Sequence, residues 1–597
     1  MIGKIKSNLY KIITVLLVVG YTFHTSSCAS TKAGPSGGPK DTIPPVVVGT
    51  NPLQNTTGFP LAEGEILLSF NEYVQLKDAY KNIVLSPPQK KNLKSRVKGK
   101  GIIVSFQEPL DTNQTYSISF GNSIVDNNES NPLYGYSFSF STGETIDSLM
   151  FSGRVVDAAT LFPLENAKVA LYINAKDSSV INNLPQSVAT TDKWGYFTLR
   201  NLKPVAYSIY AFSDENNNNM YDPGSEKIAF CDSLVIPVEV MKADSPQLKY
   251  YDPKDTVACL SRPGEIELSL FKENPVTQFI MDYKRTSRRS AYIKFNAHNT
   301  QIDSFSIAGL KDEQLIRQFN LTNDSLVFWI NEPGKVADTL ELAVKYHKTD
   351  SLGRLVPSVE KLKLVAPFEK KDDKKKDDQK NKLKFNIIAD SKMVEQDGIV
   401  LEFSDPLVVK RFDTLSFIMS TPKQIKSNVE FSVAQDSTDI NRYIIRPDVQ
   451  FVAGNDYMIK FPAGMFKDIN GFANDSTETK ITLPNNDKAS SLTLEISGVN
   501  ARYIVELIND MRTTVYRKYV INSDCELVFP YLDKGKYSIR ITQDKNSNGL
   551  LDTGDLLSGR QPEKVLIYTL PGGKQYIELN EKTDLVQSVN IEELFEK

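Results

Sequence analysis

The chain contains two internal repeats, and this repetition constrains its fold more than any other feature. Residues 41–143 correspond to about 384–485, and residues 148–245 correspond to about 490–590. In the second pair the matching positions run without a gap from Leu202 to Asp222 and from Leu532 to Asp552. At roughly 150 residues per domain, 597 residues suggest about four domains. The repeats therefore predict two kinds of module, each present twice.

Apolar and polar residues alternate in short runs along most of the chain, for example at 66–70, 116–120 and 136–140. Such alternation is typical of half-buried β-strands, and many of them at short spacing favour β-sandwiches. Asn, Asp, Gly and Pro separate the runs, as expected for turns. The predicted fold class is all-β, with sandwich modules in tandem.

Residues 255–367 carry similar runs and are predicted to form a further sandwich of unassigned type. Residues 368–383 are rich in Lys and Asp, which favours a solvated linker over a short charged helix. The predicted segments are, in order, 1–27 (signal peptide), 28–40 (tether), 41–143, 148–245, 255–367, 368–383, 384–485 and 490–590. Five sandwiches in series would project tens of ångströms from a membrane.

The N-terminus has the pattern of an export signal. Lys4, Lys6 and Lys11 precede the apolar run 12–23, which is too short to span a bilayer comfortably. The small residues 25–27 then lead directly to Cys28. This pattern resembles a bacterial lipobox, although Thr25 stands where Leu is usual. The resemblance implies lipidation of Cys28, and Ala29 favours the outer membrane, on either face; an ordinary signal peptide with an incidental cysteine is the alternative.

Three further cysteines, Cys231, Cys259 and Cys525, are an odd number, so at least one is unpaired within the chain. Cys231 and Cys259 could form a disulfide in an exported protein, but buried free thiols are favoured for all three.

The first module resembles the bacterial Ig-like domain family described in surface-layer proteins. It begins with Asp41-Thr42-Ile43-Pro44-Pro45 and carries an L-x-F strand at 68–70 and a Y-x-I-x-F strand at 116–120. The resemblance is looser for 384–485, which lacks the opening turn. Together with the tether, the opening segment also resembles a group of lipoproteins common in the Bacteroidetes.

Residues 148–245 resemble the transthyretin-like regulatory domain found beside carboxypeptidases and in many bacterial surface proteins. The resemblance rests on the opening strand at 151–157 and on the turn Thr191-Asp192-Lys193-Trp194-Gly195-Tyr196-Phe197. The copy at 490–590 lacks a clear version of this turn, so its similarity is weaker.

A repeated loop rich in Asp and Asn is the best candidate for a site. Its oxygen-bearing side chains follow the spacing of EF-hand calcium ligands, at positions 1, 3, 5 and 9 in the first copy (Asp214, Asn216, Asn218 and Asp222) and at 1, 3, 5, 9 and 12 in the second (Asp544, Asn546, Asn548, Asp552 and Asp555). In the first copy Glu226 lies one residue beyond position 12. Gly549 and Asn219 occupy position 6, where the left-handed conformation is needed. Oxygen ligands without His or Cys favour Ca²⁺ in a structural role. The alternative is a polar hairpin turn held by its own hydrogen bonds.

The sequence offers little for catalysis or for nucleic-acid binding. Lys and Arg total 70 against 73 Asp and Glu, so there is no basic footprint for nucleic acid. His298 and His347 lie in unrelated contexts, and the G-x-S-x-G match at 34–38 lies in the tether rather than on a strand-to-helix turn. Carboxylates are numerous, but none of them is marked as a catalytic pair.

These observations predict a non-enzymatic, lipid-anchored envelope protein that serves as a scaffold or as an adhesion and interaction spacer. The first alternative is a protein that binds a surface glycan or another envelope component, with Trp329 and the loop tips as contacts. An enzyme that uses carboxylates of 255–367 is a third reading.

Overall fold

The computed structural model describes residues 41–62, 64–174, 178–239, 266–367, 382–449, 451–452, 454–483 and 489–596. These residues form five β-sandwich modules with only short helices, which confirms the all-β prediction. The predicted signal peptide, the tether, Cys28, Cys259 and nearly all of the charged linker lie outside the described residues. No helix in the described part is both long and apolar enough to cross a membrane.

Module 1 (41–147) is an Ig-like sandwich of two sheets. One sheet has the order β1 (Val47–Asn51), β2 (Glu65–Phe70), β6 (Gly101–Ser105) and β5 (Lys94–Lys98). The other contains β4 (Val84–Ser86), β7 (Thr115–Ser119) and β9 (Ser137–Ser141), and β3 (Val74–Leu76) pairs with β8 (Ile124–Asp126). A short helix, α2 (Ala79–Asn82), precedes β4. Alternate residues of the strands, such as Ile66, Leu68 and Ile118, are fully buried, as the sequence pattern predicts.

Module 4 (382–483) has the strand order of module 1 with one additional edge strand, β29 (Lys426–Asn428). One sheet has the order β25 (Phe385–Ile388), β26 (Ile399–Phe403), β31 (Arg442–Pro447) and β30 (Phe431–Gln435). The other has the order β29, β28 (Ser416–Ser420), β32 (Asp456–Phe461) and β34 (Thr477–Thr482), and β27 (Leu407–Lys410) pairs with β33 (Phe466–Asp468). The hydroxyl of Tyr116 accepts the N–H of Asp111 at 3.0 Å, and that of Tyr457 accepts the N–H of Val452 at 2.8 Å. In both modules a tyrosine hydroxyl therefore bonds to the backbone N–H of the residue five positions before it, so the repeat includes this contact.

Module 2 (149–272) has two groups of strands that share β17 (Ile266–Lys272). The first is β13 (Tyr196–Leu202), β10 (Leu149–Asp157) and β17; the second is β12 (Ser187–Thr190), β11 (Lys168–Tyr172), β14 (Ser208–Phe212) and β15 (Lys227–Phe230). Strand β17 runs parallel to β10 and antiparallel to β15. The boundaries predicted from the sequence place these residues in the segment 255–367, whereas they complete module 2. The alternating pattern of a strand does not reveal its partner, which here lies far upstream.

Module 5 (489–596) repeats this arrangement. The first group of strands is β38 (Cys525–Leu532), β35 (Ser490–Ser497) and β42 (Asp584–Asn590). The second group is β37 (Val515–Ile521), β36 (Tyr503–Asn509), β39 (Gly535–Gln543) and β40 (Val565–Ile567). The first and last strands of the module in sequence, β35 and β42, run parallel, as β10 and β17 do in module 2. Tyr207 donates its hydroxyl hydrogen to the carbonyl of Lys203 at 3.3 Å, and Tyr537 donates to that of Asp533 at 2.8 Å. Modules 2 and 5 are thus structural repeats of each other.

Module 3 (278–367) is a separate sandwich, as predicted for this part of the chain. One sheet is β18 (Ile280–Arg285), β19 (Ser290–Phe295), β22 (Ser325–Ile330) and β21 (Leu315–Phe319), and the other is β20 (Ile302–Ile307), β23 (Thr339–Thr349) and β24 (Leu355–Val365). Trp329 is 5% exposed at the end of β22. It is therefore not available as a surface contact for a glycan, contrary to the sequence-based alternative.

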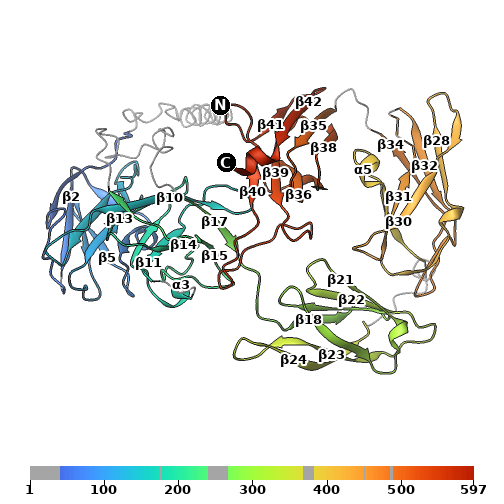
Figure 1. Ribbon diagram of the computed structural model, residues 1–597, viewed down its shortest axis with the longest axis horizontal. Helices are drawn as coiled ribbons and strands as arrows, with labels where there is room; N and C mark the ends of the chain where they lie inside the picture. Colours follow the sequence, from blue (N-terminus) through green and yellow to red (C-terminus); the bar gives the residue numbers. More distant parts are fainter. Residues whose placement is uncertain are drawn as a thin grey trace, which may run out of the picture.

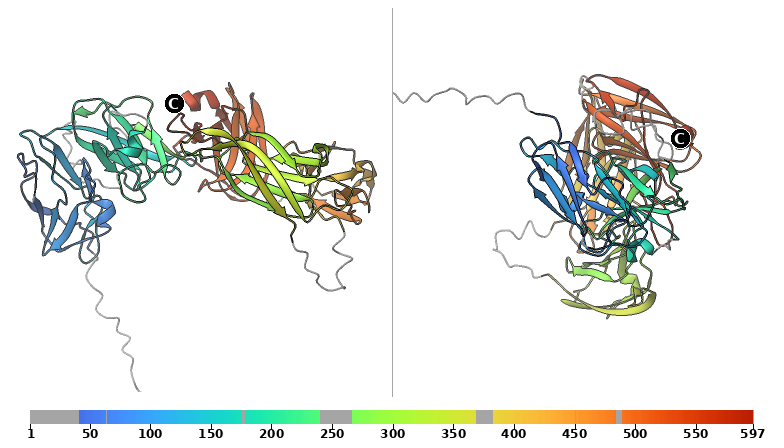
Figure 2. Two further views of the ribbon diagram at one scale, coloured as in Figure 1. Left: turned by 90° about the horizontal axis from the view of Figure 1, so that it is seen from below. Right: turned by 90° about the vertical axis from the view of Figure 1, so that its left-hand side faces the viewer.

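The five modules do not form a simple series (Figure 1). Module 5 contacts module 4 through an ion pair of Lys392 with Asp533 at 2.8 Å. Module 4 contacts module 3, where the Ile440 N–H donates to the Gln318 side chain at 3.0 Å. Module 5 also packs on module 2, so modules 2 to 5 form a closed arrangement, with module 1 beyond module 2 at one end (Figure 2). The linear series expected from the sequence is wrong, because chain order alone does not reveal contacts between distant segments.

Candidate functional site

The two Asp/Asn loops occupy equivalent places in modules 2 and 5. The first loop (213–226) connects β14 to β15, and the second loop (544–564) connects β39 to β40. In each module the two flanking strands are neighbours in one sheet. The loops are therefore hairpin tips and not helix-flanked EF-hands.

A hydrogen-bond network holds the first loop together. The two carboxylate oxygens of Asp214 accept the N–H groups of Asn218 at 2.9 Å and Asn219 at 3.0 Å. The amide oxygen of Asn216 also accepts the N–H of Asn218, at 3.0 Å. The Nδ2 groups of Asn216 and Asn218 donate to Oδ2 of Asp222 at 2.6 and 3.2 Å. All four predicted side chains of this loop are thus brought together.

The second loop has the same network at the matching positions. Asp544 accepts the N–H groups of Asn548 at 3.1 Å and Gly549 at 3.0 Å. Asn546 accepts the N–H of Asn548 at 3.2 Å. The Nδ2 groups of Asn546 and Asn548 both donate to Oδ2 of Asp552 at 2.7 Å. The equivalence of the two loops therefore includes each bond of the network.

The backbone conformations of the loops also match. Asn219 and Gly549, at position 6, have φ of 59° and 72°, as the sequence pattern requires. At position 4, Asn217 and Ser547 have φ of 60° and 62°. Two left-handed residues within three positions produce the tight curvature of each loop.

A buried glutamate completes each loop. Glu226 accepts the N–H groups of Glu215 at 2.9 Å and Asp222 at 3.0 Å. Glu563 accepts those of Lys545 at 2.7 Å and Asp552 at 3.0 Å. Sequence reasoning noted Glu226 but missed Glu563. The signal that could have found it is the Glu-Lys pair at the start of the second strand, at 226–227 and at 563–564.

Asp555, predicted as the ligand at position 12, is not part of the network. Its carboxylate accepts the N–H of Ser558 at 2.8 Å, and its backbone pairs with Arg560. The reason is an insertion. Glu226 follows Asp222 by four positions, whereas Glu563 follows Asp552 by eleven, so the second loop carries seven additional residues.

A basic side chain faces the first aspartate of each loop. Arg502 Nε lies 3.1 Å from Oδ2 of Asp544, whose side chain is fully buried. In the first loop the buried Lys168 interacts electrostatically with Asp214, and burial lowers the pKa of Lys168 to about 8. Burial raises the pKa of Asp214 and also the pKa values of Glu226 and Glu563. Both networks therefore hold carboxylates in desolvated surroundings.

The loops supply oxygen donors suited to Ca²⁺ but do not form a cluster of acids. Oδ1 of Asp214 and Oδ1 of Asn216 converge on one N–H, so two oxygens already lie around one point. Each amide oxygen has a second lone pair for a cation. Within the described ranges, no three His, Cys, Asp or Glu side chains form a metal-binding group. A bound calcium would therefore depend on Asn and backbone oxygens besides the carboxylates.

The additional residues of the second loop pack on module 2. Leu556 is 3% exposed and joins a buried cluster that includes Tyr221 and Phe271. A Cβ atom at Gly554 would lie 2.6 Å from the Phe271 ring, so only glycine fits there. Thr553 donates its hydroxyl hydrogen to the Lys272 carbonyl at 2.6 Å. Residues 553–561, the segment that contains the insertion, are here called the docking arm.

Glu273 connects the two loops directly. One of its oxygens accepts the Leu556 N–H at 2.6 Å, and the other accepts the hydroxyl of Tyr221 at 2.6 Å. Tyr221 belongs to the first loop and is fully buried. The two loops therefore share one buried hydrogen-bond acceptor at the contact between modules 2 and 5.

Two arginines of module 5 extend this interface. The guanidinium of Arg512 lies over the Phe162 ring at 4.2 Å and donates to the carbonyl of Thr160. Arg540 donates to the carbonyl of Ala159 at 3.3 Å and pairs with Glu506 at 2.7 Å. Charge-assisted bonds of this kind to backbone carbonyls fix the orientation of two packed modules.

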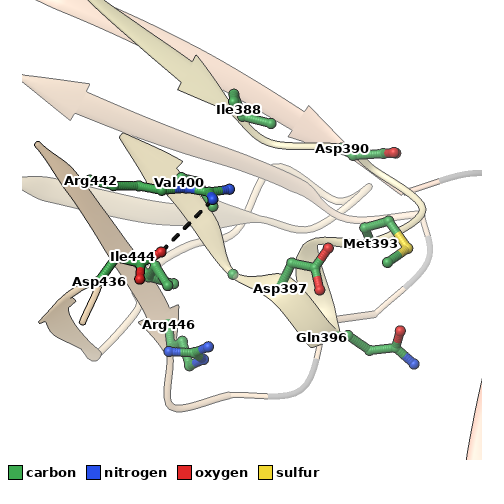
Figure 3. A pocket seen from close by; sticks show the side chains of 11 residues that line it. Ile388, Asp390, Met393, Gln396, Asp397, Val400, Asp436, Arg442, Ile444 and Arg446 are labelled. Carbon is green, nitrogen blue, oxygen red and sulfur yellow. Dashed lines mark ion pairs between the residues drawn. The ribbon is translucent and has the colours of Figure 1, made fainter. Parts of the chain in front are cut away.

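A pocket of about 240 Å³ on module 4 has no catalytic constellation (Figure 3). It contains Asp390, Asp397 and the ion pair of Arg442 with Asp436, whose charged atoms are 3.8 Å apart. No Ser, Thr, Cys or His lines it. In module 3, His298 Nε2 lies 3.1 Å from a carboxylate oxygen of Asp324, and His347 Nε2 lies 3.4 Å from one of Asp303. Cys231 and Cys525 are half-buried free thiols.

Residues 41–142 match the bacterial Ig-like domain family. This match confirms the resemblance deduced from the opening turn and strands of module 1, and it covers about a sixth of the chain. No curated protein matches the sequence. What is shown is an all-β, multi-domain protein whose first module has the bacterial Ig-like fold.

Among solved structures, the surface-layer protein rSbsC(31–844) is 10% identical, with 74% of this chain and 67% of that chain covered and a TM-score of 0.15. The major pilin subunit BcpA of Bacillus cereus is 9% identical, with 74% and 99% covered and a TM-score of 0.12. The human desmocollin-1 ectodomain is 10% identical, with 74% and 79% covered and a TM-score of 0.12. Such scores carry no argument about function.

Proposed function

We propose that the chain is a non-enzymatic cell-envelope protein that is anchored to the outer membrane by lipid on Cys28. Its modules would act as a scaffold or as an adhesion and interaction spacer. The observation that carries this proposal is the docking arm, which fastens module 5 to module 2 and closes four modules into one unit. A bacterial Ig-like first module next to the predicted tether supports a place at the cell surface.

Calcium is proposed as a structural ion of both Asp/Asn loops. Its ligands would be Asp214, Asn216, Asn218, Asp222 and Glu226 in the first loop, and Asp544, Asn546, Asn548, Asp552 and Glu563 in the second. Because Glu273 connects the loops, calcium would stiffen the contact between modules 2 and 5 as well as the hairpin tips. The repeated topology of these modules agrees with the proposed transthyretin-like type.

The anchoring proposal is tested in cells that express the chain together with a fatty-acid analogue that can be labelled. We expect the label on the wild-type protein, recovery in the outer-membrane fraction, and loss of both with Cys28→Ala. Cys525→Ala serves as the matched control and should keep both properties. Label-free protein, or retention of the label in Cys28→Ala, would contradict the anchor.

A second candidate function is binding of a surface glycan or another envelope component. It is favoured by Tyr134 of module 1 and Trp194 of module 2, which are 38% and 37% exposed. Lys193 Nζ lies 5.9 Å from the Tyr134 ring and 5.4 Å from the Trp194 ring. Exposed aromatic rings beside a cation form a plausible sugar-stacking surface.

Tryptophan fluorescence tests this alternative, because Trp329 is buried and Trp194 is half-exposed. A saturable change on titration with purified envelope polysaccharide, absent from Trp194→Phe, would support glycan binding. The same change in both proteins, or none in either, would remove the observation that favours it.

A further inference from the structure

Module 1 has an uneven distribution of charge. All eight of its Lys and Arg residues lie between positions 77 and 100, at 77, 81, 90, 91, 94, 96, 98 and 100, and Asp78 is the only acidic residue in that segment. The remainder of the module, 41–76 and 101–143, contains no Lys or Arg. One stretch of 24 residues therefore carries the module's entire positive charge.

The fold places this stretch along an edge of the sandwich. It includes the helix α2, the edge strand β5 and the loop between β4 and β5. Lys94, Arg96 and Lys98 alternate along β5, so their side chains point to the same side of the sheet. All eight basic residues are exposed. We call this surface the basic edge.

Few of these charges are neutralised within the module. Arg96 lies 3.7 Å from Glu65, and both side chains are more than half exposed, so this pair is weak. Lys100 donates to the carbonyl of Asn71 and lies 5.5 Å from the Tyr73 ring. Four acidic residues accompany this edge: Asp78 within the stretch, Glu65 beside Arg96, Glu72 near Lys100, and Glu108, which accepts the Lys91 N–H at 3.2 Å. Eight basic residues against these four leave an excess of positive charge.

Exposed apolar and aromatic side chains accompany the lysines. Tyr73, Tyr80 and Val97 are 61%, 63% and 43% exposed. A depression of about 400 Å³ lies between α2 and β5, with Tyr80, Lys94, Ser95 and Arg96 among its lining residues. Lysines with exposed tyrosines are the combination found where proteins meet the headgroup region of a bilayer.

Lysines on an edge strand also prevent unwanted strand pairing, and this role could explain β5 alone. It does not explain the five basic residues outside β5, nor the two exposed tyrosines. A surface for an anionic partner accounts for both.

We propose that the basic edge of module 1 docks on the anionic phospholipid headgroups of the membrane to which the chain is anchored. Module 1 begins at Asp41, only 13 residues after Cys28, so a tether of residues 28–40 keeps it within reach of the bilayer surface. Phosphate groups would bind beside the depression, where Lys94 and Arg96 supply positive charge.

The test uses the chain from residue 28 with Cys28→Ala, so that no lipid anchor contributes. Its co-sedimentation is measured with phosphatidylethanolamine vesicles that contain or lack 30% phosphatidylglycerol. We expect binding to the anionic vesicles only, and at least about tenfold weaker binding for Lys94→Gln/Arg96→Gln/Lys98→Gln or in high salt. The matched control Lys284→Gln/Lys361→Gln/Lys363→Gln alters three exposed lysines of module 3 and should bind like the parent.

A thermal melt of each variant verifies that the modules remain folded. Equal binding to both kinds of vesicle, no binding, or unchanged binding of the β5 variant would overturn the proposal. Because Cys28→Ala is present throughout, a failure here is independent of the lipid-anchor proposal, which the fatty-acid label tests.

Discussion

The first and second Asp/Asn loops have the same hydrogen-bond network but different surroundings. In the first loop the chain proceeds from Asp222 to Glu226 within one turn, and Asn217 donates to the Tyr80 carbonyl of module 1 at 2.8 Å. The second loop is longer by seven residues, and the longer segment contains the docking arm that packs on module 2. An insertion at one point of a repeated turn thus adds a packed contact between modules, while the turn itself is unchanged.

The comparison also shows where the stability of each loop resides. The turn depends on Asp and Asn side chains that accept backbone N–H groups of the same loop. These contacts are local, and the spacing of Asp and Asn in the sequence predicts them. The docking arm depends on burial of Leu556 against residues of another module. The first kind of interaction is repeated in the sequence, and the second is not.

Removal of the Leu556 side chain from the docking arm should have the largest effect on stability. Leu556→Ala removes a 3% exposed side chain from a packed cluster, and such changes cost about 2–5 kcal/mol. We expect a lower unfolding midpoint in urea and a larger radius of gyration in solution scattering, as module 5 separates from module 2. The neighbouring Leu557, which is 63% exposed, provides the control Leu557→Ala, which should change neither quantity. Equal effects of the two variants would show that the arm does not hold the modules together.

Removal of the first aspartate should weaken both loops by similar amounts. Asp214→Ala leaves the Asn219 N–H without an acceptor and Asp544→Ala leaves the Gly549 N–H without one, at about 1–3 kcal/mol for a buried group. The N–H groups of Asn218 and Asn548 lose one of two acceptors and keep Asn216 and Asn546. The measurement is hydrogen exchange of Asn218, Asn219, Asn548 and Gly549, which should accelerate only in the loop that is altered. Faster exchange in one variant and unchanged exchange in the other would show that the networks are not equivalent.

The residue at position 6 provides a finer comparison. Gly549 has φ of 72° and open space where a Cβ would lie, so Gly549→Ala should cost about 1 kcal/mol through backbone strain alone. Gly549→Asn should cost less, because Asn219 already adopts φ of 59° in the first loop. Denaturant unfolding curves of the two variants test this order, and a larger loss with Asn would contradict it.

The smallest expected effect distinguishes the sequence-based ligand set from the structural one. Asp555→Ala should leave any calcium-dependent rise in melting temperature unchanged, because Asp555 lies outside the network. Glu563→Gln should reduce that rise, because Glu563 bonds to the backbone on both sides of the loop. The opposite ranking in a thermal melt with and without calcium would restore Asp555 as the ligand.

Much of the fold could be predicted from the sequence. Alternation of apolar residues identified the strands, and the two repeats identified the paired modules, since both are local or self-similar signals. The placement of β17 could not be predicted, because a strand pattern does not name its partner. The docking arm could not be predicted either, because burial of Leu556 against Phe271 depends on two segments that share no sequence signal. The insertion moves Glu563 away from the spacing of the first loop and places Asp555 at position 12, so the spacing alone selects the wrong residue.

Titration of residues 29–597 with calcium in a calorimeter tests the central claim most directly. Two equivalent loops predict binding near two ions per chain, a single apparent affinity, a higher melting temperature, and loss of all three in Asp214→Ala/Asp544→Ala. Absence of heat and of any thermal shift up to millimolar calcium would contradict the claim, and the loops would then be polar turns stabilised by their own hydrogen bonds.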